Sequence, residues 1–167
     1  MRFSRQTVKN MVINFLIFFS VYLAVHFYQI RNTPSGSAPE IVGYSINNTM
    51  FADLKTMEKP VLVHFWATWC KVCEFEHGTI NQISQDFSVI GIASQSGSLT
   101  EVKTYMEDHG ITYPVVLDSK GANSRAWGIV GYPTSFVIGE NNSIDFVEVG
   151  FTTEWGIRFR LWLASIF

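Results

Sequence analysis

The segment HFWATWCKVCEFE, residues 64–76, holds both cysteines of this 167-residue chain. Cys70 and Cys73 stand three positions apart, with Trp69 before the first and Glu76 three residues after the second. A secreted domain that depends on disulfides for stability carries more cysteines at wider spacing. A single close pair therefore directs attention to the chemistry of the two thiols.

The sequence around the pair predicts a strand followed by a helix. The apolar, β-branched run VLVHFWA (61–67) is typical of a buried strand, and apolar residues recur at helical spacing after the pair. We expect Cys70 at the helix N-terminus, where the partial positive charge and free N–H groups stabilise a thiolate, with Lys71 adding a cation. Cys70 can then attack a partner's disulfide, and Cys73, one turn inside, can resolve the mixed disulfide.

Three other interpretations of the CxxC pair remain open. As a structural cross-link it would stabilise the fold by only roughly 2 kcal/mol, because the loop it closes is short. A structural zinc site needs four ligands, and His64 and His77 are too few and too close to the pair. Soft thiolates also bind copper, and His109 is the remote histidine that such a site would use.

Composition and charge limit the functional classes. The chain is 47% hydrophobic and 15% aromatic with five prolines, which is typical of a globular protein and not of a disordered one. The first 31 residues contain four basic residues and no acid, so the remainder, with 8 basic and 14 acidic residues, has a net charge of −6. An acidic domain without a basic patch argues against nucleic acid as a partner.

The N-terminus predicts a membrane anchor. Residues 11–30 are uncharged, and 20 helical residues span about 30 Å, the thickness of a bilayer's hydrocarbon core. The preceding basic residues keep the N-terminus in the cytoplasm. A cleaved signal peptide is the alternative, but its apolar core is usually shorter, and Pro39 discourages cleavage after the small residues that precede it. We therefore expect a cytoplasmic tip and anchor over residues 1–31, a linker over 32–39 and one domain over 40–167.

Strands and helices alternate through the rest of the chain and end in a hairpin and a helix. This order predicts an α/β sandwich of three layers. The last helix is expected to carry Trp155, Phe159, Trp162 or Leu163, and Ile166 on one face. The other predicted elements are strands at 87–94, 113–118, 134–138 and 143–150, a helix at 99–110 and a helical turn at 121–127.

PVLVHFWATWCKVC (60–73) resembles the active-site strand and turn of thioredoxin-fold proteins. The longer similarity, from about residue 40 onward, is to the TlpA/ResA-like group of membrane-anchored bacterial thiol–disulfide oxidoreductases. Members of this group show FWATWC-x-x-C followed by x-x-Glu, which matches Glu76, and AWGIVGYPTSFVI (126–138) resembles their Gly-x-Pro-Thr segment. The segments HGITYPVVLDSKG (109–121) and NNSIDFVEVG (141–150) are similar as well. The resemblance implies a thioredoxin-like sandwich.

The resemblance also implies the surroundings of the cysteine pair. Pro133 matches the proline that follows a cis peptide bond and lies against the pair, and the backbone of Tyr132 then binds an extended substrate segment. Trp69 belongs to the same substrate-binding surface. Glu76 matches an acid that affects the proton chemistry of the thiols. His64 stands where thioredoxin has a buried acid, so it is either a proton relay or a core histidine.

The expected function is the reduction of disulfides in partner proteins by Cys70 and Cys73, without cofactor or metal. The resemblance implies a membrane-embedded dithiol electron donor, anchorage in the bacterial inner membrane through residues 11–30, and a domain in the periplasm. Oxidation of partner thiols by the same residues is one alternative. A copper-binding protein on the same fold is another, although such proteins typically use CxxxC.

Overall fold

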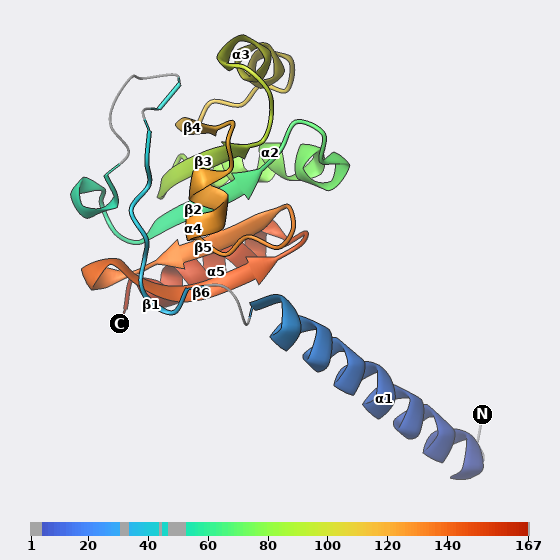
Figure 1. Cartoon of the computed structure of the whole chain (residues 1–167). Helices are drawn as coiled ribbons and strands as arrows, with labels where there is room; N and C mark the ends of the chain where they lie inside the picture. The colour runs from blue at the N-terminus through green and yellow to red at the C-terminus, as the bar shows by residue number, and fades with distance from the viewer. Residues whose placement is uncertain (1–4, 31–33, 44, 47–52, 167) are drawn as a thin grey trace. The chain divides into compact units, whose positions relative to one another are not determined.

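The computed structural model describes residues 5–30, 34–43, 45–46 and 53–166, which form parts of two compact units, Met1–Asn32 and Thr33–Phe167. The first unit contains one helix, α1 (Arg5–Ile30), drawn in blue in Figure 1. Its segment Val8–Val25 has a mean hydropathy of 1.8, and none of it is buried. Length and composition make α1 a candidate membrane span.

The second unit is built on a mixed six-stranded sheet in the order β1-β6-β5-β2-β3-β4 (Figure 1). The strands β2, β3 and β4 run parallel to one another, whereas β5 is antiparallel to β2 and β6 to β5. The strand bounds are β1 Gly36–Ser37, β2 Val61–Trp66, β3 Ser88–Ser94, β4 Val115–Asp118, β5 Thr134–Ile138 and β6 Ser143–Val149. This arrangement confirms the thioredoxin-like fold that the sequence predicts.

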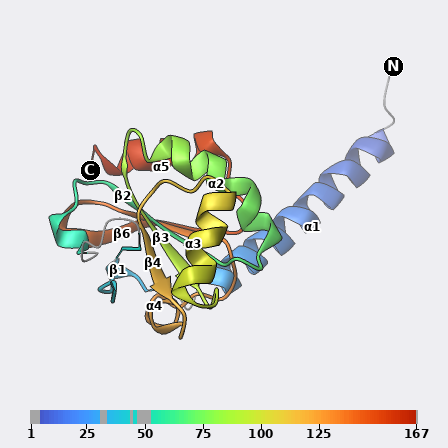
Figure 2. The same ribbon diagram turned by 90° about the horizontal axis from the view of Figure 1, so that it is seen from above.

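Helices cover both faces of the sheet and make the three layers. The helices α2 (Lys71–Ile83), α3 (Leu99–Asp108) and α5 (Glu154–Ala164) share one hydrophobic core with one face. The other face packs against η1 (Leu54–Thr56) and the end of α4 (Ala122–Ala126). Figure 2 shows α2 and α5 on one side of the sheet and α4 on the other.

The central strand β2 is buried along its whole length, and its side chains alternate between the two cores. Leu62 and Trp66 belong to the core beneath α2 and α5, and Val63 and Phe65 belong to the core on the opposite face. His64 has the same parity as Leu62 and Trp66, so its side chain points toward the α2 face. The register of β2 thereby places His64 on the same side of the sheet as the cysteine pair.

The segment before the domain contains one paired element that the sequence did not predict. The short strand β1 pairs antiparallel with β6, opposite Ser143 and Ile144. It lies within residues 32–39, the predicted linker. A 3-10 turn, η2 (Glu140–Asn142), joins β5 to β6 in the predicted hairpin.

The apolar row predicted for one face of the last helix does not face the core. Ile157, Leu161 and Ala164 are buried in the core, whereas the predicted apolar row points away from it. Trp155, Phe159, Trp162 and Ile166 are all exposed. Both rows of α5 are apolar at helical spacing, so periodicity alone does not choose between them.

Candidate active site

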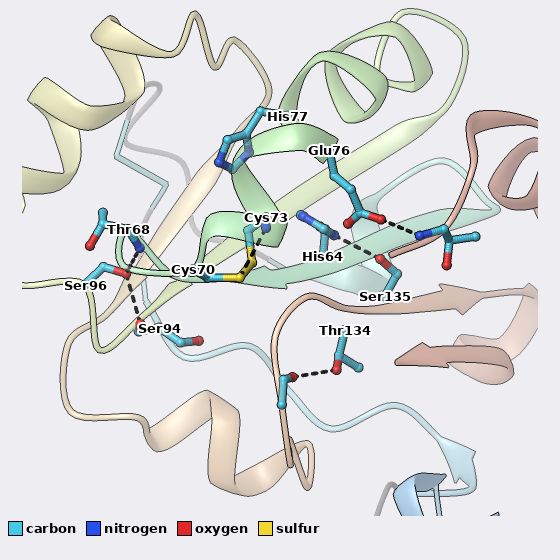
Figure 3. The surroundings of a disulfide bond; sticks show 12 residues. His64, Thr68, Cys70, Cys73, Glu76, His77, Ser94, Ser96, Thr134 and Ser135 are labelled. Carbon is cyan, nitrogen blue, oxygen red and sulfur yellow. Dashed lines mark hydrogen bonds between the residues drawn. A yellow bond between two sulfur atoms is a disulfide. The ribbon is translucent and has the colours of Figure 1, made fainter. Parts of the chain in front are cut away.

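The two cysteines form a disulfide at the start of α2 (Figure 3). Cys70 is the N-cap of this helix, and its Sγ accepts a hydrogen bond from the backbone N–H of Cys73 at 3.2 Å. Cys70 retains 8% of its surface, whereas Cys73 is completely buried. A molecule approaching the pair therefore meets Cys70 first, in the one position where free helical N–H groups point at a sulfur.

The turn before the pair contacts the loop that carries the proline. Trp69 is 61% exposed, and its ring lies edge-on against Tyr132, with 5.5 Å between ring centroids. The Tyr132–Pro133 peptide bond is cis, as the resemblance implies, and β5 begins at the next residue. The structure therefore brings two of the three predicted substrate-binding residues, Trp69 and Tyr132, into direct contact.

A buried polar network also holds the hydroxyl group of Tyr132. Its hydroxyl donates to Ser124 Oγ at 3.2 Å, and Ser124 Oγ lies 2.9 Å from the Asp118 carboxylate and 2.7 Å from Ser94 Oγ. The Asp118 carboxylate also accepts the Ser124 backbone N–H at 2.9 Å. The network therefore holds the residue before the cis bond to the ends of β3 and β4.

Glu76 is a buried acid on α2. Only 1% of its surface is exposed, and its Oε1 accepts the backbone N–H of Thr152 at 2.6 Å. Its Oε2 has no hydrogen-bond partner within the described part of the chain. Burial raises the pKa of Glu76 to about 7, and the hydrogen bond from Thr152 opposes the rise. A carboxyl group in this environment exchanges a proton near neutral pH.

His64 is a completely buried histidine on β2. Its Nδ1 lies 2.9 Å from Ser135 Oγ on β5, and its Nε2 has no partner among the described residues. Burial, with a smaller contribution from the nearby His77, lowers the pKa of His64 to about 3, so the ring is neutral at physiological pH. Figure 3 shows His64 near Cys73, with the dashed line from its imidazole running to Ser135.

His77 is a buried residue near the pair to which the sequence analysis assigned no role there. It is 1% exposed, its Nδ1 lies 3.0 Å from the hydroxyl of Tyr113, and its Nε2 lies 3.4 Å from the hydroxyl of Tyr105. Burial lowers its pKa to about 4. Its spacing was the available signal, since Cys73, His77 and Ile80 follow one face of α2 at i, i+4 and i+7.

His109, the remote histidine of the copper interpretation, packs against Tyr105, which also contacts His77. It stacks on Tyr105 with 3.9 Å between ring centroids, and its Nδ1 lies 2.9 Å from the Tyr105 carbonyl oxygen. Its Nε2 lies 3.7 Å from Glu74. Within the described ranges, no three His, Cys, Asp or Glu side chains are grouped so that they can hold a metal ion.

Comparisons with known proteins agree with this geometry. Residues 34–155 match the Redoxin family. The chain is 32% identical to the thiol:disulfide interchange protein DsbE of Escherichia coli over 69% of its own length and 60% of that protein. It is 28% identical to the thiol-disulfide oxidoreductase ResA of Geobacillus thermodenitrificans, over 72% and 76% of the two chains.

A solved structure supports the same assignment. The thiol:disulfide interchange protein of the thioredoxin family from Chlorobium tepidum superimposes with a TM-score of 0.65 at 30% identity, over 78% of this chain and 97% of that one. The fold, the Cys70–Cys73 disulfide at the start of α2 and the two named relatives agree with one another. The chain therefore belongs to the Redoxin family and is a thiol–disulfide oxidoreductase of the DsbE/ResA type.

Proposed function

We propose that this enzyme is tethered to the bacterial inner membrane by α1 and reduces disulfides of partner proteins in the periplasm. The observation that carries the proposal is the Cys70–Cys73 disulfide at the N-terminus of α2, with Cys70 partly exposed, Cys73 buried, and the buried Glu76 three residues further along the helix. The basic residues Arg2, Arg5 and Lys9 near the N-terminus and the apolar window Val8–Val25 support the tether and its orientation.

The reaction begins with the reduced pair. The Cys70 thiolate attacks one sulfur of the partner's disulfide, forms a mixed disulfide with it and releases the partner's other sulfur as a thiolate. Cys73 then loses its proton and attacks Cys70 Sγ, which closes the Cys70–Cys73 disulfide and releases the second partner thiolate. The partner gains two electrons, which the pair loses, and a membrane-embedded dithiol donor returns them by the same exchange in reverse. No cofactor takes part.

We propose that Glu76 accepts the proton that Cys73 loses. The carboxyl group is buried on the same helix, has one oxygen without a partner among the described residues and has a pKa raised to about 7, so it can accept a proton and return it. His64, with its pKa lowered to about 3, stays neutral during the reaction. We therefore propose that His64 is a neutral core histidine, held by Ser135, and not the proton store.

The partner's polypeptide binds beside Cys70. Trp69 and Tyr132 form an aromatic contact on one side of the pair, and Pro133 begins the turn into β5. We propose that the backbone of Tyr132 hydrogen-bonds an extended segment of the partner, as an added strand does. Val72 and Phe75, which are 45% and 77% exposed on the first turn of α2, extend the apolar surface that such a segment covers.

Alkylation in intact cells tests orientation and direction together. Because Cys70 and Cys73 are the only cysteines, a membrane-impermeant maleimide reports on this pair alone. A periplasmic reductase kept reduced by its donor is labelled at the partly exposed Cys70 before lysis and without added reductant, whereas Cys73 is completely buried. An enzyme that is kept oxidised and acts as an oxidant reacts with the maleimide only after dithiothreitol treatment. A domain in the cytoplasm reacts only after lysis. The double variant Cys70→Ser/Cys73→Ser is the control for background labelling.

A further inference from the structure

We propose that the exposed aromatic face of α5 lies on the lipid surface of the membrane and holds the redox domain against the bilayer. This surface, here called the α5 stripe, consists of Trp155, Phe159 and Trp162 on α5 and of Ile166 in the turn that follows the helix. The inference rests on the proposed tether, because it needs a membrane close to the domain.

The α5 stripe is not part of the protein core. Its four side chains are 82%, 58%, 54% and 54% exposed, and they recur at intervals of four, three and four residues, the first three on α5 and the last in the turn after it. Phe159 and Trp162 stack on each other with 6.0 Å between ring centroids, which makes a continuous apolar surface. An isolated exposed apolar residue is ordinary, whereas a continuous row of large apolar side chains marks an interaction site.

The short connection between α1 and the sheet keeps an anchored domain close to the bilayer. Only six residue steps separate Ile30, at the end of α1, from Gly36, where β1 joins the sheet. Fully extended, they span no more than about 20 Å. An anchored domain therefore stays near the headgroups, and among the surfaces that can face them the stripe has the matching chemistry, because tryptophan is enriched at membrane interfaces.

The charged side chains around the α5 stripe form ion pairs within the protein. Arg158 pairs with Glu154 and with Asp86, each at 2.7 Å, and Arg160 pairs with Glu148. The domain as a whole is acidic, and a bilayer with anionic lipids repels an acidic surface. Every acid named here contacts an arginine, and the two arginines leave only one net negative charge among the three acids, which reduces this repulsion at the border of the stripe.

Docking through the α5 stripe would set the distance between the active site and the membrane surface. Thr152, two residues before α5 begins, donates its backbone N–H to Glu76, and the neighbouring Phe151 is 58% exposed. The end of the stripe that carries Trp155 is therefore next to the acid of the redox site. On the membrane, α5 would keep the cysteine pair near the surface, within reach of a dithiol donor embedded in the bilayer.

Tryptophan quenching by spin-labelled lipid tests this proposal. All five tryptophans lie between residues 66 and 162, so α1 is silent in fluorescence. The full chain is reconstituted in phosphatidylcholine vesicles with and without a lipid that carries a nitroxide near the headgroup. We expect quenching in the wild type and loss of most of the quenchable emission in Trp155→Phe/Trp162→Phe, whose exposed substitutions keep an aromatic ring.

Trp69→Phe is the matched control, because Trp69 is an exposed tryptophan outside the stripe. This variant keeps the quenching if α5 faces the lipid, and loses it if the active-site surface does, which overturns the proposal. Unquenched emission from vesicle-bound protein also overturns it, whether the stripe then faces solvent, a second copy or a partner protein. Flotation on a density gradient separates this result from a failure of the tether, in which the chain does not float with the vesicles at all.

Discussion

Replacing Glu76 by glutamine should change how stability depends on pH. Glu76 has a pKa of about 7 in the folded protein against an ordinary value of 4.5. Each unit of difference between the folded and unfolded pKa is worth 1.36 kcal/mol, so burying the charged carboxylate costs about 3 kcal/mol at high pH. Glutamine retains an oxygen that can accept the Thr152 N–H and has no proton to lose.

The direction of this pH dependence follows from whether the folded or the unfolded chain keeps the proton of Glu76. Between pH 4.5 and 7 the unfolded chain has lost the proton of Glu76, whereas the folded chain keeps it. The wild type is therefore stabilised by this group at low pH and loses that stability as the pH rises through about 7. From pH 5 to pH 8, the wild type should lose about 2.5 kcal/mol relative to Glu76→Gln.

Denaturant unfolding of the oxidised full chain in a non-ionic detergent measures this difference. Tryptophan emission reports on the redox domain alone, because no tryptophan lies in α1. Any constant cost of the buried amide cancels when the two proteins are compared at pH 5 and pH 8, as do contributions from the histidines. Parallel pH curves for wild type and Glu76→Gln would refute the raised pKa and, with it, the assignment of Glu76 as the proton acceptor.

Three further outcomes follow from the site. Cys73→Ser should accumulate mixed disulfides with partner proteins on non-reducing gels, whereas Cys70→Ser should not; trapping by Cys70→Ser would reverse the two roles. As the pH falls below 6.5, His64 alone should lower the free energy of unfolding of the wild type by up to about 1.4 kcal/mol per pH unit, because the folded ring resists protonation down to about pH 3. His64→Asn should reduce the slope of stability against pH by one proton. An unchanged slope would contradict the burial of a neutral imidazole. Tyr132→Phe should lose about 1 kcal/mol of stability, because it lacks the hydrogen bond to Ser124, but it should keep the near-UV circular dichroism signal of Trp69. Tyr132→Ala should change both the stability and this signal. Equal effects of the two variants would contradict the contact between the rings of Trp69 and Tyr132.

The sequence predicted the fold well where local pattern and chain order agree. The β-branched run before Cys70 is the buried strand β2, and the spacing after it places Cys70 at the N-cap of α2. The strands and helices from residue 87 onward lie where periodicity and turn residues put them. The resemblance, and not periodicity, supplied the cis bond before Pro133.

The features that the sequence did not predict depend on contacts between distant segments. The short strand β1 exists because β6 pairs with it, and two residues have no periodicity to detect. The orientation of α5 depends on which of its two apolar rows fits the core, and the row with Ile157 and Leu161 is the buried one. The surroundings of His77 come from tyrosines 28 and 36 residues further along the chain.

The reduction potential of the Cys70–Cys73 pair tests the central claim most directly. The full chain in detergent is equilibrated against dithiothreitol or glutathione buffers, and its free thiols are counted by alkylation. The reductase proposed here predicts a potential near roughly −270 mV or lower, as in thioredoxin, which a membrane dithiol donor would keep reduced. A potential near roughly −120 mV would contradict it and make the same two cysteines an oxidant of partner thiols.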